Sequence, residues 1–103
     1  MKLEFESYEE GFGGELKCPS CGGSSLHHEK VDIFNRSKNS EDDDPDGLHV
    51  KIENDTVTTD TNLSGNPSQR RYGLTILFWC ESCNHKPLLS ISQHKGNTWL
   101  DIR

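Results

Sequence analysis

CPSCGG (residues 18–23) and FWCESCNH (residues 78–85) are the two stretches of this sequence that decide its fold. Each contains a Cys-x-x-Cys pair, and 58 residues lie between the pairs. Four thiolates at ~2.3 Å satisfy a tetrahedral Zn²⁺ completely, so no position is left for a catalytic water. We therefore predict one structural zinc ion. Its predicted ligands are Cys18, Cys21, Cys80 and Cys83.

The spacing within each pair has a physical reason. Two intervening residues let the backbone curl so that both sulfurs point at one metal, while N–H groups of the turn donate to them. Residues that tolerate a left-handed backbone suit the position after the second thiol. Gly22 and Asn84 occupy those positions here.

With these residues the sequence resembles the zinc-ribbon family, and it is similar to small uncharacterised bacterial and phage zinc-ribbon proteins. The resemblance implies two zinc knuckles at the ends of an antiparallel sheet, and it implies no activity. Many ribbons separate their pairs by roughly 15–20 residues. The longer separation here implies an inserted hairpin and acidic loop, which leaves the order of the strands open.

Other roles for the cysteines are a redox pair, two disulfides, or iron in the same ligand set. A thioredoxin-like pair begins a helix in a βαβ unit, and neither pair here precedes a helical pattern. The start, MKLEFESYEE, lacks the order of a secretory signal, and no apolar run reaches ~18 residues. We expect a soluble, cytoplasmic protein with reduced thiols.

Length and composition allow one small domain. The chain has 103 residues, of which 30% are hydrophobic and 27% charged. We predict an N-terminal arm at residues 1–15 and a single zinc-ribbon-like domain at residues 16–103, with an acidic loop at residues 36–46. So small and polar a chain buries little, and a structural metal compensates for that.

Hydrophobic alternation predicts strands throughout and no helix. The fold class is therefore a small all-β protein with an antiparallel sheet of about four to six strands. Asn54-Asp55 and Gly96-Asn97 are expected to form turns. The predicted strands are residues 26–35, 48–52, 56–59, 72–79, 89–91 and 99–102, with 72–79 in the centre because both of its faces are apolar.

One pattern matches the calcium loop D-x-D-x-D-G-x₅-E. Its context argues against calcium, because Pro45 interrupts it, residues 48–52 alternate like a strand, and no helix flanks it. We expect no calcium site here. The matching residues are Asp42, Asp44, Asp46, Gly47 and Glu53.

The histidines and serines indicate no catalytic site. His27, His28, His49 and His94 lie in predicted strands, where an exposed histidine is ordinary. His85 follows Cys83 closely enough to support a thiolate. No serine or cysteine is placed beside a base by any motif, so we predict that the protein is not an enzyme.

The net charge of −6 disfavours duplex binding, because nucleic-acid affinity comes largely from Lys and Arg. We expect a non-catalytic module that binds another macromolecule, and we expect that macromolecule to be a protein. The alternative is nucleic-acid binding through residues 61–103, which hold five Lys/Arg against two Asp/Glu. Residues 42–46 also resemble the acidic hairpin of transcript-cleavage ribbons, without their tip motif.

Alternation along the predicted strands suggests a binding surface. If Leu74, Ile76 and Phe78 face the core, Trp79 and Trp99 share the outer face. Tryptophan with arginine is typical of interface hot spots. The alternative is that the N-terminal arm covers both rings with Leu3, Phe5 and Tyr8. The candidate surface is Arg70, Arg71, Trp79 and Trp99.

Overall fold

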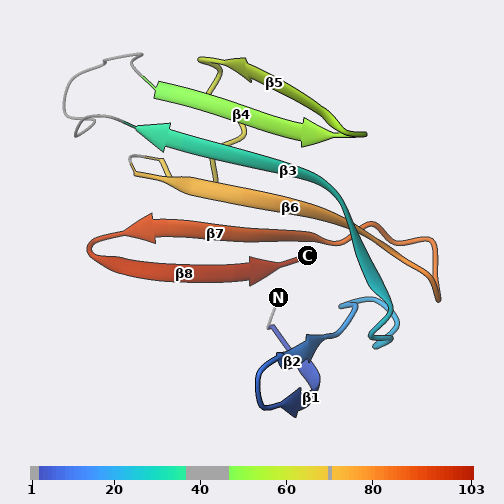
Figure 1. Cartoon of the computed structure of the whole chain (residues 1–103). Coiled ribbons are helices and arrows are strands. Elements are labelled where there is room, and N and C mark those ends of the chain that lie inside the picture. The colour runs from blue at the N-terminus through green and yellow to red at the C-terminus, as the bar shows by residue number, and fades with distance from the viewer. Residues whose placement is uncertain (1–2, 37–46, 70) are drawn as a thin grey trace.

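The computed structural model describes residues 3–36, 47–69 and 71–103, and this part of the chain is all-β (Figure 1). It contains a six-stranded antiparallel sheet and a separate two-stranded sheet, which confirms the predicted fold class. Within these ranges there is no helix of the length and apolarity needed to cross a membrane. The strands are β1 (Phe5–Glu9), β2 (Gly13–Leu16), β3 (Leu26–Arg36), β4 (Gly47–Glu53), β5 (Thr56–Asp60), β6 (Gly73–Cys80), β7 (Leu88–His94) and β8 (Asn97–Ile102).

The large sheet has the order β5-β4-β3-β6-β7-β8, so it consists of two antiparallel meanders that meet where β3 pairs with β6. The turn between β4 and β5 lies at Asn54 and Asp55, as predicted, and both have positive φ, 52° and 61°. This is the geometry of a two-residue turn that follows the strand twist. The turn between β7 and β8 uses Lys95 and Gly96, one residue earlier than predicted.

The register separates the side chains of the large sheet into two faces of different chemistry. We call the first the apolar face and the second the polar face. The apolar face carries Val31, Ile33, Leu48, Val50, Ile52, Val57, Leu74, Ile76, Phe78, Leu89, Ile91, Leu100 and Ile102. The polar face carries Lys30, Asp32, Phe34, His49, Lys51, Thr75, Leu77, Trp79, Ser90, Ser92, Trp99 and Asp101.

The link between β5 and β6 covers part of the polar face with its described residues, 61–69 and 71–72. In Figure 1 this link passes behind β4 and β3. Gly65 lies over the Phe34 ring, and Phe34 is only 3% exposed. Asn66 fixes the link, because its amide donates to the carbonyl of Arg71 at 2.9 Å and its oxygen accepts the N–H of Ser68 at 3.0 Å.

The buried side chains are divided between the two faces, although alternation placed the core on the apolar face alone. Ile102 on the apolar face is 1% exposed, and Phe34 on the polar face is 3% exposed. Thr75 and Ser90 on the polar face are buried, whereas Leu74, Ile76 and Phe78 on the apolar face are only half-buried. One physical reason is the link between β5 and β6, which covers Phe34 and Gly73 on the polar face. Strand patterning cannot predict this cover.

The predicted N-terminal arm is a β-hairpin formed by β1 and β2. Gly14 lies directly against Phe5, where a Cβ would come within 2.9 Å of the ring. Phe5 and Tyr8 remain exposed, and Trp79 and Trp99 are 42% and 57% exposed. The hairpin thus does not enclose the two tryptophans.

The acidic residues of the calcium-like pattern, Asp42, Asp44 and Asp46, lie outside the described residues, as does most of the predicted acidic loop. The last seven positions of the pattern form β4 from Gly47 to Glu53. An extended strand of this length separates its ends by roughly 20 Å.

Gly73→Ala tests the contact between the link and the sheet. A Cβ at Gly73 would clash with the side chain of Asn66 and the ring of Pro67. We expect a loss of about 1–3 kcal/mol in the free energy of unfolding, as for other overpacked sites. Urea denaturation measures it, with the exposed Thr58→Ala as control, and equal stabilities of the two variants would contradict the packing described here.

Candidate functional site

The four cysteine sulfurs form one cluster. The Sγ atoms of Cys18 and Cys83 are 3.8 Å apart, those of Cys21 and Cys80 are 3.6 Å apart, and all four lie within 4.8 Å of one another. A metal held tetrahedrally at ~2.3 Å from four sulfurs places neighbouring sulfurs ~3.8 Å apart. A disulfide needs ~2.05 Å, so these distances fit metal ligands. The cluster can hold a metal ion.

The pairing of β3 with β6 brings the two cysteine pairs together. Cys80 is the last residue of β6 and pairs with Leu26, the first residue of β3. Beyond this pair, the N–H of Glu81 donates to the carbonyl of Ser25 at 3.1 Å. The first knuckle precedes β3 and the second follows β6, and an antiparallel pairing places both at the same end of the sheet.

Backbone N–H groups surround the sulfurs, as the spacing of the pairs predicts. The first knuckle is closed by hydrogen bonds from Cys18 N–H to the Gly23 carbonyl at 2.7 Å and from Gly22 N–H to the Cys18 carbonyl at 2.9 Å. Gly23 N–H donates to the Cys21 sulfur at 3.4 Å. Gly22 has φ 78°, whereas Asn84 does not use a left-handed conformation.

The thiols differ in acidity. Burial opposes ionisation of Cys80, but the N–H of Ser82 and the neighbouring thiols outweigh it and lower its pKa to about 7. At Cys83 the N–H of His85 favours the thiolate, but burial and the neighbouring thiols raise its pKa to about 11. His85 therefore acts on the cluster through its backbone. Four adjacent thiolates repel one another, and a bound cation removes that repulsion.

Trp79 belongs to the surroundings of this cluster. Its ring stacks on His27 with centroids 4.5 Å apart, and His27 Nε2 lies 2.8 Å from a carboxylate oxygen of Glu81. Because Trp79 and Glu81 flank Cys80, the stack holds β3 beside the second knuckle. Trp79 thus has a structural role in addition to its exposed edge.

Trp99 lies at the opposite end of the polar face. It pairs with Ser92, which pairs with Gly73, six residues before Trp79 on β6. The two tryptophans are therefore about 20 Å apart along the strands and do not form a joint surface. Of the two arginines predicted to accompany them, Arg70 lies outside the described residues and Arg71 is exposed.

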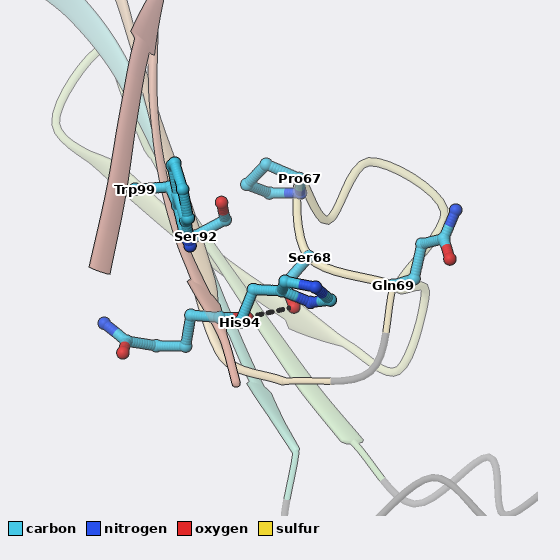
Figure 2. A pocket seen from close by; sticks show the side chains of 7 residues that line it. Pro67, Ser68, Gln69, Ser92, His94 and Trp99 are labelled. Atoms are coloured by element: carbon cyan, nitrogen blue, oxygen red, sulfur yellow. Dashed lines mark hydrogen bonds between the residues drawn. The ribbon is translucent and has the colours of Figure 1, made fainter. Parts of the chain in front are cut away.

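A hollow of about 510 Å³ opens beside Trp99. Figure 2 shows Pro67 across the hollow from Trp99 and Ser92, with His94 and Ser68 at its other end. The Ser68 hydroxyl donates to the Gln93 carbonyl at 2.8 Å, which fixes the link to β7. Among the residues that the structure describes, the lining contains no Lys, Arg, Asp or Glu. We call this site the Trp99 hollow; its residues are Pro67, Ser68, Gln69, Ser92, Gln93, His94 and Trp99.

His49 forms a cluster that the sequence did not reveal. Its Nε2 lies 2.7 Å from Asp32 and its Nδ1 2.9 Å from Asp60, while its ring stacks on Phe34 at 4.7 Å. Only the protonated ring can donate to both carboxylates. Burial disfavours that charge, but Asp32 and Asp60 outweigh it and raise the pKa of His49 above 6.5. The three residues are far apart in sequence, so only the register joins them.

No protein-family model matches this chain, and neither a curated protein nor a solved structure shows significant similarity to it.

Cys80→Ser tests the metal centre. We expect one metal ion per chain in the wild type and a large loss of bound metal in the variant, because three thiolates no longer complete the site. Elemental analysis of purified protein measures the stoichiometry. Ser82→Ala, in the same knuckle, is the control and keeps its metal. A wild type with far less than one metal ion per chain would contradict the assignment.

His49 makes stability depend on pH. A pKa raised on folding means that the folded state binds the proton more tightly, so the stabilisation is full below pH 6.5 and is lost as pH rises through the folded pKa. We expect the advantage of the wild type over His49→Gln to be largest below pH 6.5 and to shrink as pH rises above it. Urea denaturation of metal-loaded protein measures it. The exposed Thr58→Ala removes no titratable group and keeps the wild-type slope. Parallel curves for wild type and His49→Gln would contradict the role of His49.

Proposed function

We propose that the chain is a zinc-ribbon-like interaction module that binds another protein through the Trp99 hollow. The cysteine cluster supports zinc, since a set of four thiolates in tetrahedral arrangement is typical of structural zinc sites. Iron is the competing metal for the same ligands. Reduced thiols in such a site fit a cytoplasmic location.

The metal has a structural role in this proposal. Its ligands flank β3 and β6, the strands that join the two halves of the large sheet, and four sulfurs leave no coordination position for a substrate. A structural zinc site contributes on the order of 10 kcal/mol to folding. We therefore expect the module to be folded only when it is loaded.

The Trp99 hollow is the observation that carries the binding function. A half-exposed tryptophan beside a proline offers an apolar wall, and the serines and histidine around it offer hydrogen-bonding groups. Such a site fits an uncharged side chain, preferably an aromatic or a proline ring. A phosphate would find no Lys or Arg among the described lining residues, and the chain is acidic overall, which together favour protein over nucleic acid.

The His49 cluster does not change the proposal to an enzyme. A cavity of about 330 Å³ lies beside it, lined by Lys30, Asp32, His49 and Ser64 among others. Both ring nitrogens of His49 already face carboxylates. No nitrogen is left to accept a proton from a nucleophile, and we assign the cluster to the stability of the polar face.

Selection from a random peptide library tests the binding function, with the zinc-loaded full chain as bait. We expect peptides that present an aromatic residue or proline, and a loss of about 30-fold in affinity in Trp99→Ala, as for an interface hot spot of about 2 kcal/mol. Trp79→Ala is the matched control, and its affinity stays close to wild type if the protein remains folded.

Titration with a single-stranded oligonucleotide tests the alternative class of function, which is nucleic-acid binding. Tight binding that weakens steeply with salt and depends on Arg71 would replace the protein-binding proposal with a nucleic-acid-binding one.

Elemental analysis of the same preparation identifies the bound metal. One equivalent of iron per chain would overturn the assignment of zinc.

A further inference from the structure

We propose that the apolar face of the large sheet is covered by a second copy of this chain, which makes the protein a face-to-face homodimer. The proposal is independent of the Trp99 hollow, which lies on the polar face.

Within the described residues, much of the apolar face is left open, although Ile102 at one end of it is buried. Leu48, Ile52, Val57 and Leu100 on this face are each more than 40% exposed, and Ile33 is 39% exposed. The link at residues 61–72 lies over the other face. The sequence between β3 and β4, SKNSEDDDPD, contains no aliphatic or aromatic residue and offers nothing apolar for a cover.

The face carries no Lys, Arg, Asp or Glu at any paired position from β4 to β8. This is unusual in a chain with 27% charged residues and a net charge of −6. Two acidic copies repel each other wherever their charges meet, and a charge-free face is where that repulsion is smallest. An apolar face is also complementary to itself, as a two-fold symmetric interface requires.

The size of the face suits a stable interface. Six strands ~4.8 Å apart and about six residues long at ~3.3 Å per residue give a face of roughly 24 by 20 Å. Side chains roughen this projected area of roughly 500 Å², so that its accessible surface approaches the ~800 Å² that each partner contributes to a standard interface.

The layer structure of the domain favours a copy over an unrelated partner. A sheet with one apolar face needs a second layer to bury it, and two identically twisted sheets pack well in aligned orientation. Other copies of the chain are present wherever the chain is made. A different partner would leave the apolar face exposed to water until that partner binds. We therefore infer that dimerisation, rather than a different partner, buries the apolar face.

Sedimentation equilibrium of the zinc-loaded full chain tests the proposal. We expect a mass of twice 11.7 kDa at micromolar concentration. Ile52→Glu places a charge among apolar side chains and raises the dimer dissociation constant at least ~100-fold. The matched control is Thr58→Glu, an exposed position on the neighbouring strand whose side chain lies on the polar face. It leaves the dimer intact.

Circular dichroism shows whether Ile52→Glu is folded. If it is unfolded, Val57→Glu is used instead, because Val57 is 61% exposed in the single chain and tolerates a charge there. A wild type that is monomeric at all concentrations overturns the proposal, and so does a dimer that both apolar-face variants leave intact. Neither result affects the Trp99 hollow, since Trp99→Ala changes peptide affinity and leaves the mass unchanged.

Discussion

The antiparallel pairing of β3 with β6 is the interaction on which the rest of the structure depends. It joins two three-stranded meanders into one sheet, and it places the two Cys-x-x-Cys knuckles at the same end. A metal bound there closes a loop of about sixty residues, and loop closure of this length costs only slightly more entropy than that of a short ribbon. The long separation between the knuckles is therefore compatible with a metal-stabilised fold.

The strands and the cysteine cluster could be predicted because both depend on local sequence. Alternation of period two gives the strands, and the turn at Asn54 and Asp55 follows from the tolerance of these residues for positive φ. The Cys-x-x-Cys pairs have few other uses in a reduced protein. The turn at Lys95 and Gly96 lies one residue before the predicted turn, because Gly96 can occupy either position of a tight turn.

The remaining features depend on long-range register or on the packing of a loop. His49 meets Asp32 and Asp60 only because β3, β4 and β5 pair in one particular alignment. Trp79 and Trp99 share a face by alternation, but their separation is set by which residue pairs with Ser92. The link covers the polar face because Asn66 and Pro67 pack against Gly73. No sequence pattern predicts this contact between a polar loop and a glycine in a strand.

The two faces of the large sheet contribute to stability in different ways. This explains why so polar a sequence needs stabilising contacts in addition to those within its own sheet. The polar face buries Phe34 beneath the link, and it buries Thr75 and Ser90, whose small polar side chains add little apolar burial. The metal centre stabilises one end of the sheet and cannot shield the aliphatic rows along its length. Several aliphatic side chains of the apolar face stay exposed in the single chain, so that burying them requires a contact outside the sheet. This is the physical basis for the dimer proposed above.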